Sequence, residues 1–522
     1  MKKSLKKSLL VGLSVLVCGA FLAGCGNDSK NAENKDTLKV AVTNFASSLD
    51  PAENFFSWVV MRYGVGETLT KFDKQMKPVP WLAAKWSVAD DKRTWTITVK
   101  DNVKFSNGKP VTAQAVKESL ERAFAKSSMP KTFFQYESLE AKGQDLIIKT
   151  DKEYPNLPSL LADPFFLVVD VQSERDGRDF AKQGPIGTGP YVVKSFTKEL
   201  AVMEANPNYW DGAVPFKTVE IPSIDDPNTR AMSLQSGDVD MAVNIGPGEI
   251  GLFKDNDKFK VDEITSLRVV LARINMNGVL GDKNVRDAVI SAADRKNYAD
   301  VLLKGTFLPG SAPIPPSMDY GFDQLKDPNA YNPDRSKQLL AQSGWTDTNG
   351  DGIVDKNGQP LTFNFIVYNS RAELPLYAEA LQADLKKIGI DMKIQTVDYN
   401  LLDGIGKEGK YDMLISNIVT ANTGDPIWFL GNYWHTNIDG SNPQNGSGYS
   451  NPQVDQLLEA ATVEFDPAKR REYAIQIQQL LMNDGAALFF GYPKTNIVNA
   501  KYLNNVVMYP SDYYWITNKI SK

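Results

Sequence analysis

The run Trp81–Phe124 constrains the fold more than any other part of this chain. It reads WLAAKWSVADDKRTWTITVKDNVKFSNGKPVTAQAVKESLERAF. From Trp95 to Val99, apolar side chains alternate with threonines, which is the period of a half-buried strand. Asn107-Gly108 favours a tight turn, and Thr112 is suited to cap a helix. The run therefore predicts a strand, a turn and an amphipathic helix with one apolar face, made of Val116, Leu120 and Phe124.

Further motifs accompany this run in a fixed order along the chain. They are Pro185–Tyr191 (PIGTGPY), Asn206–Trp210 (NPNYW), Asp226–Arg230 (DPNTR), Asn284–Ala288 (NVRDA), Gly344-Trp345 and Asp425-Pro426. Together with Trp81–Phe124 they resemble the extracytoplasmic solute-binding proteins, family 5, of peptide and nickel ABC importers. The resemblance covers nearly the whole chain after its N-terminal segment.

The resemblance implies an α/β protein with a two-lobed periplasmic-binding-protein-like fold of class II. Two crossover strands would join the lobes, and an extra α+β domain would be inserted in the first lobe. The second half supports an α/β lobe by its own pattern, because a helical repeat from Tyr377 to Ile388 precedes Gly389 and an alternating run at 390–394. The implied parts are a signal peptide (1–24), a lipidated tether (25–36), the first lobe (37–58, 181–264 and 486–522), the inserted domain (59–180) and the second lobe (265–485).

The N-terminal segment has the pattern of a bacterial lipoprotein signal. Four lysines precede the apolar stretch Leu9–Leu22, and Leu22-Ala-Gly-Cys25 resembles a lipobox. The alternative is a transmembrane anchor, but the apolar stretch is shorter than the roughly 20 residues that span a bilayer. Of the two cysteines, Cys18 would be removed with the signal, which leaves Cys25 to carry a thioether lipid, with palmitate on its amine. We expect a lipid-anchored protein on the extracytoplasmic face of the cell membrane.

Composition narrows the class of protein and of partner. With 522 residues the chain is expected to form more than one domain, and 42% hydrophobic with 23% charged residues is typical of a soluble globular protein. The formal net charge is −5, and no basic cluster interleaves with aromatic residues outside the N-terminus, which argues against nucleic acid. A monomer is expected, with a permease and an ATPase as partners by resemblance.

Catalytic motifs are scarce. His435 is the only histidine, so a His-based triad could use no other residue and an H-E-x-x-H zinc motif is impossible; no G-x-S-x-G elbow is present. Carboxylates alone are able to hydrolyse glycosides, which keeps a secreted carboxylate-based hydrolase as an alternative. The prediction is that the protein is not an enzyme and has no cofactor.

An acidic loop has the spacing of a calcium site. Asp347, Asn349, Asp351 and Asp355 occupy positions 1, 3, 5 and 9, and Gly352 occupies position 6. Position 12 is a glycine instead of the bidentate glutamate, so the loop lacks two of the expected oxygens. We favour the alternative, an Asx-rich turn without metal.

Three polar residues bear on the identity of a ligand, all by resemblance. Many peptide-binding members carry an aspartate where this chain has Asn422, and it pairs with the amine of the peptide. The nickel branch carries an arginine where this chain has Asp163; this aspartate either meets a cationic group or caps a turn. His435 lies near the histidine that contacts metal in a nickel-type member, although a structural histidine is the alternative.

Aromatic residues are expected to wall the ligand cleft, because such clefts bury small ligands against aromatic rings. The resemblance places Phe55, Phe56 and Trp58 in the first lobe and Trp428, Tyr433 and Trp434 in the second; core packing is the alternative for each. We expect the ligand to be a short peptide or a peptide-like solute. The alternative ligand is a nickel or other metal chelate, since one histidine cannot hold a bare metal ion.

Overall fold

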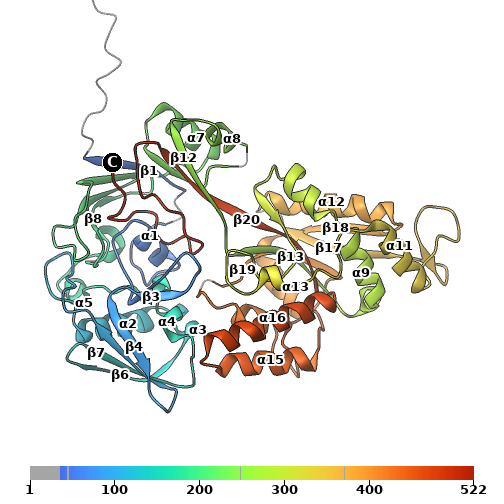
Figure 1. The fold of residues 1–522 in the computed structure, drawn as a ribbon, viewed down its shortest axis with the longest axis horizontal. Helices are drawn as coiled ribbons and strands as arrows, with labels where there is room; N and C mark the ends of the chain where they lie inside the picture. Colours follow the sequence, from blue (N-terminus) through green and yellow to red (C-terminus); the bar gives the residue numbers. More distant parts are fainter. Residues whose placement is uncertain (1–35, 44–45, 247, 369–370, 422) are drawn as a thin grey trace, which may run out of the picture. The chain divides into compact units, whose positions relative to one another are not determined.

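One long strand, β20 (Ala487–Ala500), belongs to both halves of the main sheet (Figure 1). Its first part pairs with β13 (Arg268–Ile274), and its second part pairs with β11 (Met241–Val243) and β12 (Phe259–Thr265). The computed structural model describes residues 36–43, 46–246, 248–368, 371–421 and 423–522. The chain thus passes between the two halves at the β12–β13 connection and again within β20.

The main sheet has twelve strands in the order β18-β17-β19-β13-β20-β11-β1-β10-β9-β8, and β12 and β14 also pair with β20. β1 is parallel to β10 and β11, and β17 is parallel to β18 and β19, while the other pairs are antiparallel. We call the β8–β11 and β1 half lobe 1 and the β13 and β17–β19 half lobe 2. The remaining strands are β1 (Thr37–Ala41), β8 (Tyr191–Phe196), β9 (Leu200–Ala205), β10 (Thr218–Pro222), β14 (Phe307–Pro309), β17 (Thr362–Tyr368), β18 (Asp391–Val397) and β19 (Met413–Val419).

Helix α12 (Glu373–Lys387) shows why lobe 2 folds as its sequence predicts. Leu374, Tyr377, Leu381 and Leu385 recur at helical spacing, and all are buried against the lobe 2 strands. Gly389, with φ +84°, takes the left-handed conformation that lets the chain turn directly into β18. The other main helices of lobe 2 are α9 (Lys283–Ala292), α11 (Pro333–Gln342), α13 (Leu402–Glu408), α14 (Ile427–Trp434), α15 (Pro452–Val463) and α16 (Pro467–Asn483).

A separate four-stranded sheet contains the run Trp81–Phe124. The Thr112 hydroxyl accepts from Ala115 N at 3.2 Å and caps helix α2 (Ala113–Lys126), whose apolar face is buried. Gly108 has φ +86° in the predicted turn. The predicted strand, turn and helix are confirmed. The strand order is β4 (Ala83–Val88), β5 (Thr94–Val99), β7 (Asp145–Thr150) and β6 (Tyr136–Lys142), preceded by a hairpin of β2 (Thr70–Phe72) and β3 (Pro78–Pro80).

Lobe 1 adds α1 (Phe56–Arg62) and α7 (Pro227–Ser236) to its strands. Across the residues described above, no helix is long and apolar enough to cross a membrane. The predicted signal peptide, Cys25 and Asn422 lie outside the described residues.

Candidate ligand-binding cavity

A cavity of about 370 Å³ lies where the chain passes between the lobes. Lobe 1 contributes Trp58 and Tyr513 to its walls, lobe 2 contributes Arg268 and Asn417, and Pro493 of β20 lies at the crossing. A volume of this size falls in the range of about 300–1,000 Å³ that small-ligand pockets occupy. The cavity therefore has both the place and the size of a small-ligand site.

Two arginines of lobe 2 give the cavity its strongest electrostatic feature. Arg268 begins β13 and donates to the carbonyl oxygen of Asn417 at 3.2 Å and to its Oδ1 at 3.3 Å. Burial, and next the positive charge of Arg371, lower the pKa of Arg268 to about 10. Within the described part of the chain, neither guanidinium has a carboxylate within ion-pair distance. Two clustered cations, neither of them in a direct ion pair with a described residue, favour an anionic ligand.

A carboxylate lies on the same wall. Glu373, in the first turn of α12, accepts from Asn417 Nδ2 at 2.8 Å, and Asn417 so connects it to Arg268. The only side chain that donates to Glu373 among the described residues is the neutral amide of Asn417, so no cation is paired with this carboxyl group there. Arginines beside a free carboxylate suit a ligand that carries both charges.

On the lobe 1 wall, by contrast, the positive charge of Arg62 is neutralised. Arg62 donates from Nη2 to Asp512 Oδ2 at 2.7 Å and from Nε to the Asp512 carbonyl at 2.9 Å. Its guanidinium lies 5.6 Å from the ring of Trp58 and 4.4 Å from that of Trp515, as cation–π contacts do. This wall is aromatic, and its positive charge is already compensated.

Two buried polar groups of the wall have no hydrogen-bond partner among the residues that the structure describes. They are the indole Nε1 of Trp58 and the hydroxyl of Ser511, both on residues that line the cavity. A buried donor without a partner costs about 1–3 kcal/mol, so such groups are usually satisfied by water or a ligand. Both atoms are buried beneath the cavity surface, so neither adds an exposed hydrogen-bonding group to it.

The predicted first-lobe aromatics divide between wall, core and surface. Trp58 lines the cavity, Phe56 is buried, and Phe55 is 46% exposed. The Phe55 ring lies 5.5 Å from that of Trp58 and 5.7 Å from that of Phe165. Of the three, the structure places only Trp58 at the cavity.

Asp163 is fully buried and acts as a cap. Its Oδ1 accepts from Phe165 N at 3.0 Å, and its Oδ2 faces the Tyr513 hydroxyl at 3.4 Å. Burial raises the pKa of Asp163 to about 7. It reaches the cavity only through Tyr513, which fits the cap alternative better than direct contact with a cationic ligand.

Helix α14 carries the predicted second-lobe aromatics away from the cavity walls. Trp428 is 59% exposed, whereas Trp434 is buried against Phe429 and Phe489. Tyr433 packs its ring 5.0 Å from the guanidinium of Arg273. None of the three predicted aromatics is among the lining residues.

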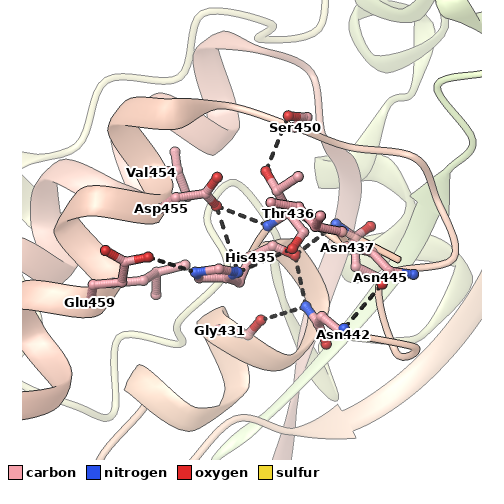
Figure 2. Close-up of polar contacts among 12 residues, drawn as sticks. Gly431, His435, Thr436, Asn437, Asn442, Asn445, Ser450, Val454, Asp455 and Glu459 are labelled. Carbon is pink, nitrogen blue, oxygen red and sulfur yellow. Dashed lines mark hydrogen bonds and ion pairs between the residues drawn. The ribbon is translucent and has the colours of Figure 1, made fainter. Parts of the chain in front are cut away.

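His435 ends α14 and faces α15 (Figure 2). Its Nδ1 lies 3.1 Å from the Thr436 carbonyl oxygen and 3.9 Å from Asp455 Oδ1, and its Nε2 lies 3.4 Å from Glu459 Oε1. The imidazole thus ties two helices of lobe 2 and does not line the cavity. Nowhere in the described ranges are three or more His, Cys, Asp or Glu side chains placed to hold a metal ion.

The carboxylates of the acidic loop accept hydrogen bonds from donors within the same loop. Asp347 accepts from Gly350 N at 2.7 Å and Gly352 N at 3.0 Å. Asp355 accepts from the amide of Thr348 at 2.8 Å and from its hydroxyl at 2.6 Å. Asn349 Nδ2 donates to Asp351 Oδ2 at 3.0 Å. This is the geometry expected of the Asx-rich turn.

Comparisons with known proteins agree with this geometry. Residues 77–441 match the model of the bacterial extracellular solute-binding proteins, family 5 Middle. The chain is 29% identical to the nickel-binding protein NikA of Staphylococcus aureus, over 95% of both chains. It is also 29% identical to the probable D,D-dipeptide-binding periplasmic protein DdpA of Escherichia coli, over 91% of this chain and 92% of that protein. The nickel ABC transporter structure from Bacillus halodurans superimposes with a TM-score of 0.82 at 27% identity, covering 93% of this chain and 99% of that one. The predicted two-lobed α/β fold is confirmed.

Proposed function

We infer that this chain, which belongs to family 5 of the bacterial extracellular solute-binding proteins, captures a short peptide or peptide-like solute for an ABC importer. The observation that carries the proposal is the pair Arg268 and Arg371, which forms no direct ion pair with a described residue, beside Glu373. These residues offer opposite charges within one small cavity.

A short peptide satisfies each of these groups. Its terminal carboxylate would accept from the guanidinium groups of Arg268 and Arg371, because charge-assisted bonds are the strongest that such a site can form. Its amine would face Glu373. Lobe closure delivers the solute to the permease only if the ligand makes better contacts in the closed state, and ligand contacts with both walls provide that bias.

A metal chelate is the second candidate, because relatives named as nickel-binding proteins match this chain closely in length. Carboxylates of a chelator would also suit the arginine pair. The metal would have to arrive inside its chelator, since the described residues offer no cluster of metal ligands and His435 faces α15. A carboxylate-based hydrolase is disfavoured because the family binds solutes, and we propose no enzymatic activity.

We also propose the domain division predicted above. The passages of the chain at the β12–β13 connection and within β20 support two crossover strands. The separate sheet of β4–β7 supports an inserted domain within 59–180. Signal cleavage before Cys25, lipidation of that cysteine and a monomeric state complete the proposal.

Mass spectrometry of the protein purified from its native host tests the ligand class. A bound peptide of a few residues is expected, and it should be released by mild unfolding. Nickel with a histidine-like or opine-like chelator, and no peptide, would replace the first candidate with the second.

A further inference from the structure

A hairpin tip that does not line the cavity is buried against lobe 2. The turn at 73–77, between β2 and β3, is closed by the Asp73 carboxylate, which accepts from Gln75 N at 2.8 Å and Lys77 N at 2.9 Å. At its tip Met76 has φ +63°, a conformation uncommon for a residue with a side chain, yet it is only 2% exposed. An unfavourable backbone around a buried apolar side chain indicates that the contacts of Met76 compensate for it.

The partner of this tip is Gly424, in the connection between β19 and α14. Gly424 has φ +70°, and a Cβ there would lie 2.7 Å from the Met76 carbonyl oxygen and 2.7 Å from Phe72 Cε1. The two backbones therefore touch without room for a side chain. The Tyr320 hydroxyl, 3.4 Å from the Gly424 carbonyl oxygen, supports the lobe 2 side of this contact.

The opposite side of the hairpin is fixed to the C-terminal segment. Phe72 N donates to the Tyr514 hydroxyl at 2.9 Å, and Tyr514 follows Tyr513 of the cavity wall. The hairpin is therefore held firmly between lobe 1 and Gly424.

Two flanking contacts reach lobe 2 from the same part of the chain. Lys77 Nζ lies 3.5 Å from Asp319 Oδ2. The ring of Phe465 stacks on Trp95 at 6.2 Å and 24°, and Lys92 Nζ lies 5.5 Å from it. The exposed ion pair contributes little by itself. The Met76 side chain belongs to the buried apolar cluster that also contains Met318 and Ala421 of lobe 2, and this burial is the part able to hold the two surfaces together.

The contact lies on the same segment as the cavity. Val419 is the last residue of β19 and lines the cavity, and the chain continues from it to Gly424. We propose that the β2–β3 hairpin is a latch, in which Met76 holds Gly424 and the start of α14 in place and so slows escape of a bound solute. The effect on the solute rests on the proposed function, whereas the effect on the lobe 2 segment does not.

Met76→Asn is the decisive variant. Asparagine accepts the left-handed backbone that this chain already gives to Asn54, Asn244 and Asn357, so the turn should persist while its apolar insertion is lost. Met76→Leu keeps the apolar volume and should therefore keep the latch intact. Lys74→Ala, in the same turn and exposed, is the matched surface control.

Three readouts on the full chain separate the outcomes. Without ligand, hydrogen exchange at 423–430 in Met76→Asn should be about tenfold faster, and the radius of gyration from X-ray scattering should rise. With Ala-Ala as probe, its dissociation should be about tenfold faster. Met76→Leu and Lys74→Ala should behave as the wild type in all three.

Unchanged exchange and scattering in Met76→Asn would overturn the latch. Faster exchange with unchanged Ala-Ala dissociation would overturn its role in retaining solute. If exchange and scattering change but Ala-Ala binds no variant, the latch stands and the peptide assignment fails.

Discussion

At the scale of single residues, Asp163 makes the stability of the protein depend on pH. Its carboxyl has a pKa of about 7 against an ordinary 3.8, because burial disfavours the ionised form. The folded state then keeps a proton that the unfolded chain has released. The contribution of this residue to stability is full below about pH 4 and is lost as the pH rises to about 7.

Asp163→Asn should remove this loss of stability at high pH, because its side chain does not ionise. Its oxygen can still accept from the amide of Phe165. At pH 8 the variant is expected to exceed the wild type in free energy of unfolding by about 2–4 kcal/mol, and the gap should close towards pH 4. Urea titrations at the two pH values measure it. An equal gap at both pH values would contradict the assigned pKa.

The cavity residues show which single residues a sequence can identify. Trp58 was predicted at the ligand, and it lines the cavity. Arg268, Arg371 and Glu373 were not predicted, because they meet only through the start of β13, the start of α12 and the bridging side chain of Asn417. The available signal was Arg268 at the start of the apolar strand RVVLARI, because charged side chains are seldom buried without a partner.

At the scale of elements, a buried ion pair joins three helices of lobe 2. Arg470 of α16 pairs with Asp425, just before α14, and also donates to the Ala461 carbonyl oxygen of α15. Asp425 Oδ1 in turn accepts from Ile427 N at 2.9 Å. Removing one partner of a buried pair leaves an uncompensated charge.

The neighbouring arginine supplies a matched control. Arg470→Met is expected to lower the free energy of unfolding by about 3–5 kcal/mol, because Asp425 stays buried without a cation. Arg471→Met removes the ion pair with the partly exposed Asp319 and should cost less than about 1 kcal/mol. Urea unfolding followed by circular dichroism compares the two. Equal losses of unfolding free energy in the two variants would contradict the stabilising role assigned to the buried pair.

Elements were predictable where short-range rules decide them. Helix α2 follows from its Thr112 cap and apolar face, and the α12–β18 unit follows from its periodicity and Gly389. Tertiary packing, in contrast, determines which side of a helix faces the core. In α14, packing turns Trp434 into the core and His435 towards α15, which the sequence pattern of this segment does not specify.

At the scale of the whole molecule, attachment to the membrane depends on one cysteine. Cys25→Ala should prevent lipidation, so that the protein is shed into the medium or the periplasm instead of fractionating with membranes. Fractionation followed by immunoblotting measures this, and a serine exchange at Cys18 is the control. Membrane association unchanged by Cys25→Ala would contradict the lipobox.

The central claim is that a ligand carboxylate binds the arginine pair of the cavity. The most direct measurement is calorimetric binding of Ala-Ala and of its C-terminal amide to the wild type and to Arg371→Ala. We expect the free acid to bind the wild type about 10- to 100-fold more tightly than the amide, and Arg371→Ala to lose most of this difference. Equal affinity of acid and amide for the wild type would contradict it.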